Sequence, residues 1–304
     1  MPQPQPRPQN PVAPYAVIGV GMAAVSSASI LISLARLEGV PALAIAALRM
    51  ALASVVAAPL ALIRARREFR AAPWRDRVLA ICSGALLAMH FGFWISSFDY
   101  TSVMSSVVFV STNPLFVGLA SWLLLRERLG SGTILGVVVG AVGGALVGLG
   151  DLSHSGMASI RGDGLSLLGA LSASGYLLIG RRLRGRMSIT LYVGIAYTVA
   201  AVCLLALLLV LRTPLAGYSA RGYLWVALLA AGPQLLGHTS YNWALKYLSA
   251  TFVTVTLLVE PIGATLLAIP ILGQTPRAMG LVGGIVILAG IFLTARAEAM
   301  GRRV

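Results

Sequence analysis

The sequence predicts an all-α membrane protein in which ten transmembrane helices form two inverted five-helix repeats. Its residues are 58% hydrophobic and only 11% charged, with a mean hydropathy of +0.88, whereas a soluble domain carries about 25% charged residues. Ten apolar runs each approach the roughly 20 residues that a spanning helix needs. Two parts of the chain also resemble each other at a constant spacing. These observations exclude a water-soluble fold.

The first half of the chain begins with a tail and continues with five helices. Residues 1-13 contain five prolines and no apolar stretch, so we expect a disordered cytoplasmic tail rather than a signal peptide. A periplasmic connecting loop is expected at 151-161, between two apolar runs. The first repeat, 14-150, is predicted to hold helices at 14-35, 42-63, 78-97, 102-125 and 132-150.

The second half repeats this plan and ends in a short cytoplasmic tail at 296-304. Cys82 and Cys203 lie inside apolar runs and show neither a pairing pattern nor metal-ligand spacing. We therefore expect both to be small core residues, and we expect no metal site and no cofactor. The second repeat, 162-295, is predicted to hold helices at 162-180, 189-211, 223-245, 250-272 and 278-295.

The basic residues predict the orientation of the chain, because lysine and arginine accumulate in cytoplasmic loops. If the N-terminus is cytoplasmic, most of the 23 lysines and arginines fall on the cytoplasmic side, above all in RARREFRAAPWRDR at 64-77. That loop would lie against the anionic leaflet. The net charge of +14 therefore predicts a multi-pass protein of the bacterial inner membrane with both termini cytoplasmic, and no nucleic-acid partner. Few basic residues remain for the outer loops: Arg36, Arg161, Arg212, Arg221 and Arg277.

An internal repeat relates residues 98-114 (FDYTSVMSSVVFVSTNP) to residues 245-261 (LKYLSATFVTVTLLVEP). Five helices per half is an odd number, so the second half must enter the membrane upside down. Inverted repeats are typical of secondary transporters, whose substrate site lies near the midplane between the halves. At one offset of 147 residues, Tyr100, Ser102, Pro114, Gly136 and Gly143 match Tyr247, Ser249, Pro261, Gly283 and Gly290.

These repeated motifs, together with LLLRERL at 123-129, resemble the EamA-type members of the drug/metabolite transporter (DMT) superfamily over nearly the whole chain. The resemblance implies a ten-helix fold and efflux of amino acids, related metabolites or drugs. The aromatic amino-acid exporters of the YddG type are one candidate subgroup. One departure is that Glu127 matches Gln274 in the second half. Because Glu127 should end the fourth helix on the cytoplasmic side, this departure bears on packing or gating as a structural charge.

Few ionisable side chains lie at membrane depth, where each costs at least about 2.5–3.5 kcal/mol. Glu260 and its repeat mate Asn113 are predicted at the centres of two helices, each directly before a proline, Pro261 or Pro114. Proline cannot donate a hydrogen bond to the carbonyl four residues earlier. The pattern predicts paired helix breaks that bind a zwitterion, with Glu260 holding a substrate ammonium or a coupling proton. A purely architectural kink is the alternative.

Two histidines, with the residues that share their helix faces, are predicted to line the rest of a substrate-binding cavity. His90 and His238 lie one residue apart under the repeat offset and share helix faces with polar and aromatic residues. Aromatic walls with a few directed polar groups are typical of ligand sites. The alternative is that each histidine only bonds to a neighbouring helix. The remaining predicted lining residues are Trp94, Tyr176, Tyr241 and Asn242, with Gln234 on the same face as His238.

We expect mainly structural roles for Arg49 and for the glycines of the glycine-rich helices. Arg49, in the second helix, could pair with a substrate carboxylate, with Asp99 or with helix carbonyls, and we favour structural pairing. The glycines predict close helix contacts, either within one half or, less favoured, in a homodimer. They recur four residues apart at 136, 140, 144 and 148, and at 280 and 284.

The function predicted from sequence is export of small metabolites, amino acids first, by alternating access of a monomer or homodimer in the lipid bilayer. Protons are the candidate coupling ion. An intramembrane enzyme using His90 or His238 with a serine, or a passive channel, is the alternative. No GxSxG elbow, HExxH motif or P-loop occurs, so we expect neither an enzyme nor ATP hydrolysis.

Overall fold

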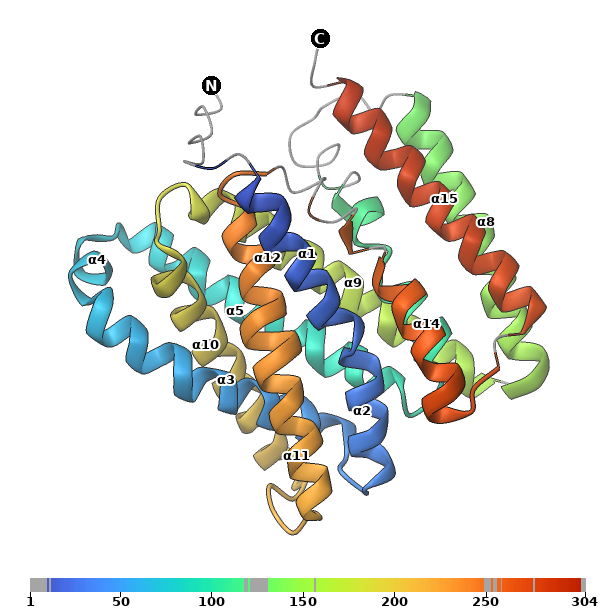
Figure 1. Ribbon diagram of the computed structural model, residues 1–304, viewed down its shortest axis with the longest axis horizontal. Helices are drawn as coiled ribbons and strands as arrows, with labels where there is room; N and C mark the ends of the chain where they lie inside the picture. Colours follow the sequence, from blue (N-terminus) through green and yellow to red (C-terminus); the bar gives the residue numbers. More distant parts are fainter. Residues whose placement is uncertain are drawn as a thin grey trace.

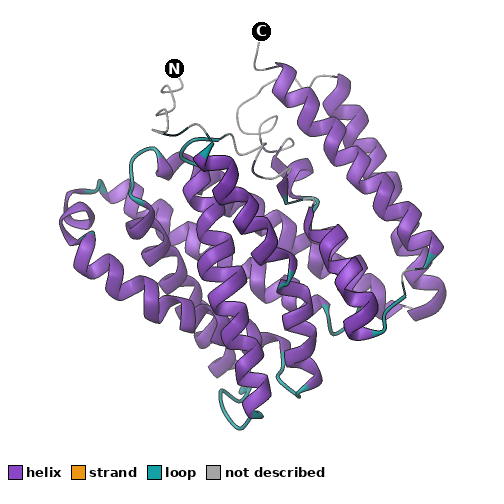
Figure 2. Ribbon diagram, viewed as in Figure 1, coloured by secondary structure: helices purple, strands orange, loops and turns teal. Residues whose placement is uncertain are grey.

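The computed structural model describes residues 10, 12–117, 120, 131–155, 157–248, 253, 256–257, 259–275 and 277–301, and these residues are helical almost throughout (Figure 2). Within these described ranges, five helices are long and apolar enough to cross a membrane. Shorter apolar helices lie at Val103–Val117, Ile134–Val147, Val259–Leu272 and Ala278–Leu293, and one further crossing runs through 220–244. The all-α membrane fold with ten crossings is confirmed.

The first half forms five crossings with one short extra helix. The first crossing is divided at Ser27, which ends one helix and begins the next. The fourth is interrupted in its middle. In chain order the helices are α1 (Ala13–Ser26), α2 (Ala28–Leu37), α3 (Ala42–Arg64), α4 (Arg66–Ala71), α5 (Trp74–Ser97), α6 (Val103–Val110) and α8 (Ser131–Ser155).

The second half forms the other five crossings. Its third crossing contains a π-helix around Pro233, which lacks the N–H that a regular α-helix would use. In chain order the helices are α9 (Met157–Arg184), α10 (Ile189–Val210), α11 (Ala220–Leu229), the π-helix η1 (Ala230–His238), α12 (Thr239–Ala244), α14 (Val259–Leu272) and α15 (Ala278–Gly301).

Three sequence predictions need correction. The expected loop at 151-161 is helical on both sides of residue 156, because helices satisfy their own backbone and can extend beyond an apolar run. The basic loop at 64-77 contains α4. Cys82 and Cys203 are exposed on the outside of the bundle. Aliphatic neighbours do not separate a core from a lipid-facing surface, since lipid tails are as apolar as leucine.

Several predictions fall where the structure gives no description. Residues 1–9, 11 and 302–304, which belong to the two expected tails, lie outside the described residues. So do residues 121–130, which include Glu127, and much of the first part of the ninth predicted helix.

The two halves pack with the symmetry that the repeat predicts. The third crossing, α5, packs along the sixth, α9, and the eighth crossing (α11, η1, α12) packs in the same way along the first (α1, α2). Three further crossings of the first half each contact their own repeat mate: α3 packs with α10, α6 with α14, and α8 with α15. Helices α8 and α15 lie side by side at one edge of the molecule (Figure 1). An odd number of crossings per half then gives the halves opposite orientations.

The glycine contact joins the two halves rather than forming within one half. A Cβ on Gly143 would lie 2.7 Å from the carbonyl oxygen of Gly283, and a Cβ on Gly290 would lie 2.6 Å from that of Gly136. These are the four glycines matched by the repeat. The expected contact within one half was therefore wrong for this helix pair, and the glycines bring α8 and α15 close enough for backbone contact.

The two crossings that contain the repeat-matched prolines Pro114 and Pro261 are both interrupted, and the interruptions place the two central polar residues. Helix α6 ends at Val110, and the chain is helical again from Asn113. Helix α14 begins at Val259, one residue before Glu260. Each proline thus stands in the first turn of a new helical segment, where its missing N–H has no partner to lose.

Candidate functional site

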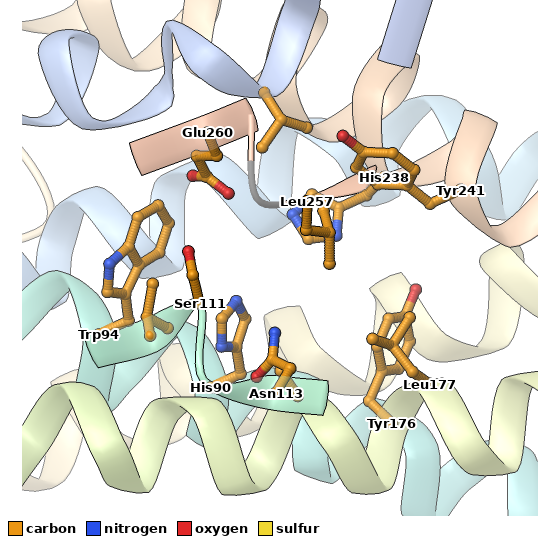
Figure 3. Close-up of a pocket in the computed structure, with 13 residues that line it drawn as sticks. His90, Trp94, Ser111, Asn113, Tyr176, Leu177, His238, Tyr241, Leu257 and Glu260 are labelled. Atoms are coloured by element: carbon orange, nitrogen blue, oxygen red, sulfur yellow. The ribbon is translucent and has the colours of Figure 1, made fainter. Parts of the chain in front are cut away.

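A buried cavity lies between the two halves, where the interrupted crossings meet α5, α9 and η1 (Figure 3). Water can occupy about 40 Å³ of it, which is room for a few molecules. Seven of the eight residues predicted to bind substrate line this cavity: His90, Trp94, Asn113, Tyr176, His238, Tyr241 and Glu260.

The repeat-related pair Asn113 and Glu260 enters the cavity from opposite sides (Figure 3). Asn113 is 6% exposed and Glu260 9% exposed. The hydroxyl of Ser174 on α9 donates to the Asn113 carbonyl at 3.2 Å, which holds the start of that helical segment. In the part of the chain that the structure describes, the Oε1 atom of Glu260 has no hydrogen-bond partner. The cavity therefore contains an acceptor that a cationic or proton-donating group could use.

Aromatic rings surround the histidines. The His90 ring stacks on Trp94 with centroids 5.7 Å apart and lies 6.3 Å from the His238 ring. His238 in turn meets Tyr241 edge-on at 6.4 Å. Such walls offer flat apolar surfaces with polar edges, which suit a small amphipathic ligand.

The hydrogen bond of His90 indicates which of its two ring nitrogens carries the proton and which is free to accept. Its Nδ1 lies 3.0 Å from the carbonyl oxygen of Gly169 on α9. A carbonyl can only accept, so Nδ1 carries the proton and the neutral ring leaves Nε2 as an acceptor. His90 therefore does both things that the sequence left as alternatives: it bonds to a neighbouring helix, and it lines the cavity.

Asn242 is the predicted binding residue that does not line the cavity. Its Nδ2 donates to the carbonyl of His238 at 2.8 Å and to the hydroxyl of Tyr176. The backbone carbonyl of Asn242 accepts from Nε of Arg184 at 3.0 Å. Asn242 therefore connects α12 to α9, and from outside the cavity lining it holds the hydroxyl of Tyr176.

Sequence reasoning missed one polar residue of the lining, Ser111. Ser111 is the C-cap residue that follows α6, and its hydroxyl has no partner among the described residues. Its position two residues before Asn113 was the available signal. The other missed lining residues are apolar: Val25, Val110, Ala173, Leu177 and Leu257.

Arg49 takes a different partner from those considered in the sequence. Asp99 instead pairs with Arg36, whose Nη2 lies 2.6 Å from its Oδ1. The Nε of Arg49 donates to Oε1 of Gln234 at 3.0 Å, and both side chains are fully buried. Gln234, predicted to share the cavity face of His238, lies behind the lining.

Comparison with known proteins places this arrangement in a family. Residues 14–149 and 160–296 each match the EamA-like transporter family. The chain belongs to the EamA-like transporter family. The resemblance seen in the repeated motifs is thereby confirmed, and the site of this EamA-like transporter draws Asn113 from the first matched segment and Glu260 from the second.

Relatives of this EamA-like transporter carry the same general name. An uncharacterized transporter of Clostridium kluyveri is 24% identical over 70% of this chain and 70% of its own length. The uncharacterized transporter YdfC of Bacillus subtilis is 25% identical over 61% of this chain and 60% of its own length. A protein of known crystal structure shares the fold, with a TM-score of 0.67 and 20% identity over 96% of this chain and 98% of that one. The chain is a multi-pass membrane transporter.

Proposed function

We propose that this transporter exports small metabolites, amino acids first among them, by alternating access around the cavity between its halves. The observation that carries the proposal is the meeting of two helix interruptions at one buried cavity, with Asn113 and Glu260 on opposite sides. Interrupted helices at a repeat interface are how secondary transporters bind substrates.

The proposed cycle begins from an occluded state. The free space of about 40 Å³ is small beside ligand pockets of about 300–1,000 Å³, so the helices around the cavity must move apart to admit a metabolite. At one end of the helix bundle, Arg36 pairs with Asp99 and donates to the carbonyl of Phe98. At the other end Arg181 on α9 donates to the carbonyls of Leu245 and Leu248. We propose that these two sets of contacts break in turn.

The proposed orientation puts the basic loop and both termini in the cytoplasm of a bacterial inner membrane. Single cysteines at Arg70→Cys and Leu215→Cys, in a background without Cys82 and Cys203, test it. We expect a membrane-impermeant thiol reagent to label position 215 in intact cells and position 70 only after permeabilisation, because inverted halves place these loops on opposite sides. Labelling of both positions from the same side would contradict the inverted repeat.

The proposed substrate class follows from the chemistry of the lining. Aromatic faces at Trp94 and Tyr241 suit apolar or aromatic side chains, and the acceptors on Glu260 and His90 suit an ammonium group. A membrane potential supplies about 2.3 kcal/mol per charge per 100 mV, which is enough to drive export through a coupling proton.

Counterflow in proteoliposomes tests this function. We expect an unlabelled amino acid inside the vesicles to accelerate uptake of the labelled compound from outside. A carrier reorients its binding site faster with substrate bound than without it, and a channel has no such step. Uptake that is neither saturable nor accelerated across an amino-acid panel would indicate a channel or another substrate class.

A matched pair of tryptophans locates the transport site. Trp94→Ala removes a ring that is 2% exposed and lines the cavity, so we expect at least about a tenfold loss of counterflow. Trp74→Ala changes a tryptophan that is 64% exposed at the start of α5, and counterflow should stay within twofold of wild type, roughly, as for surface substitutions generally. Equal losses in the two variants would contradict the assignment of this cavity.

A further inference from the structure

Arg49 is a buried cation with most of its hydrogen-bonding capacity unused. Its side chain is 0% exposed. The Nε donates to Gln234, and the guanidinium carbon lies 3.9 Å from the centre of the Phe91 ring. The Nη1 and Nη2 atoms have no hydrogen-bond partner within the described part of the chain. Four of the five N–H donors of the guanidinium therefore await acceptors.

A buried cation in this condition is costly, and the observed contacts offset only part of the cost. Cation–π contact with Phe91 and one neutral hydrogen bond stabilise the charge, but a removed or missing counter-ion leaves an uncompensated buried charge. The protein thus holds a guanidinium at membrane depth whose Nη1 and Nη2 atoms have no hydrogen-bond partner among the described residues. Such a residue normally faces a partner or an aqueous cavity.

The carboxylate whose charge acts on Arg49 is Glu260, and its hydrogen bonding is also incomplete. Among the described residues Glu260 is the one carboxylate that acts electrostatically on Arg49, and Arg49 is the one basic residue that acts on Glu260. No nitrogen of Arg49 comes within 4.0 Å of a Glu260 oxygen, since the described ion pairs involve other residues. A buried cation and a buried carboxylate therefore act on each other without forming an ion pair.

One aromatic ring separates Arg49 from the cavity. Phe91 lies 4.6 Å from the ring centre of His90 and 5.2 Å from that of His238, and both histidines line the cavity. The charge of Arg49 acts on both histidines. Gln234, which holds the guanidinium, lies on the same π-helix as His238, and π-helical turns are frequent at functional sites.

We propose that Arg49, held by Gln234, binds the carboxylate of the substrate while Glu260 binds its ammonium group, so that the carrier selects zwitterions. A carboxylate matches the planar donors of a guanidinium in a two-bond arrangement. It reaches Nη1 and Nη2 when the Phe91 ring turns aside. This inference rests on the proposed function and adds the group that distinguishes amino acids from simple amines.

The test compares L-phenylalanine and L-leucine with phenylethylamine and isoamylamine, which lack the carboxylate, as competitors and as counterflow substrates in proteoliposomes. For the wild type we expect each amino acid to bind at least about tenfold more tightly than its amine. In Arg49→Lys and Arg49→Gln the affinity for the amino acids should fall by roughly 10- to 100-fold, while the affinity for the amines changes little.

The ratio of amino-acid to amine affinity is the readout that a merely structural arginine would not move. Gln234→Leu should lower the ratio in the same direction, and Arg75→Lys, at an exposed position in the first turn of α5, should leave it unchanged. A wild type that exchanges amines as well as amino acids would overturn this inference and leave the proposed function standing. If neither class is exchanged, the proposed function fails and the inference fails with it. Variants that lose thermal stability but keep the wild-type ratio would assign Arg49 to folding alone.

Discussion

Replacing Glu260 with glutamine is expected to abolish proton-driven export, reducing it to the rate of protein-free vesicles, while substrate binding stays measurable. Glutamine keeps the size and the hydrogen-bonding oxygen of glutamate but cannot exchange a proton. Glu260 is the acidic residue of the cavity lining, and its Oε1 has no partner in the described structure. If the cavity couples the two fluxes, Glu260 is the lining carboxylate that can carry the proton.

The measurement is substrate export from vesicles under an imposed proton gradient, alongside binding of the same amino acid without a gradient. Glu38→Gln is the matched control, because it makes the same chemical change at a partly exposed carboxylate outside the cavity lining, which accepts from the hydroxyl of Ser219 at 2.7 Å. We expect this control to export at the wild-type rate. Flux with an unchanged pH dependence in Glu260→Gln would exclude the coupling role and leave Glu260 as an ammonium ligand only.

The sequence was sufficient for the fold because the bilayer constrains it strongly. Each spanning segment must be predominantly apolar, and its backbone groups must find their hydrogen bonds inside the protein, mostly within a helix. The repeat then supplied the symmetry. It also identified Asn113 and Glu260, because a polar residue before a proline at matched depth is rare in an apolar run.

Lipid-facing and buried positions were harder to separate. In a soluble protein an aliphatic neighbourhood indicates the core, but here Cys82 and Cys203 have such neighbours and are exposed. The glycine spacing likewise predicted a contact without showing which face of α8 makes it. Both errors have one cause, since hydrophobicity does not distinguish lipid from protein.

The partner of Arg49 could not be read from spacing. Arg49 and Gln234 are 185 residues apart, and the repeat offset does not relate them. Gln234 also lies on η1, where the helical period changes, so a face assigned with the regular α-helical period misplaces it. Only the packing of α3 against η1 brings the two side chains together.

Substituting Gly283 with alanine is expected to lower the free energy of unfolding by about 1–3 kcal/mol, the usual cost of overpacking. The new Cβ would lie 2.8 Å from the carbonyl oxygen of Gly143 and 2.9 Å from the backbone nitrogen of Val147. Backbone atoms cannot rotate away as a flexible side chain would. Helices α8 and α15 would therefore have to separate, which weakens a contact between the two halves.

The neighbouring glycine provides the matched control for that prediction. Gly284 lies on the same helix, but a Cβ there would meet only a methyl of Val108 at 3.6 Å, an ordinary contact distance. Gly284→Ala should therefore stay within about 0.5 kcal/mol of wild type, although it makes the same change in helix propensity. Thermal unfolding of both variants in the same detergent measures the difference. Equal stabilities would mean that α8 and α15 do not approach through Gly143 and Gly283, and the packing of the halves along this edge would need another explanation.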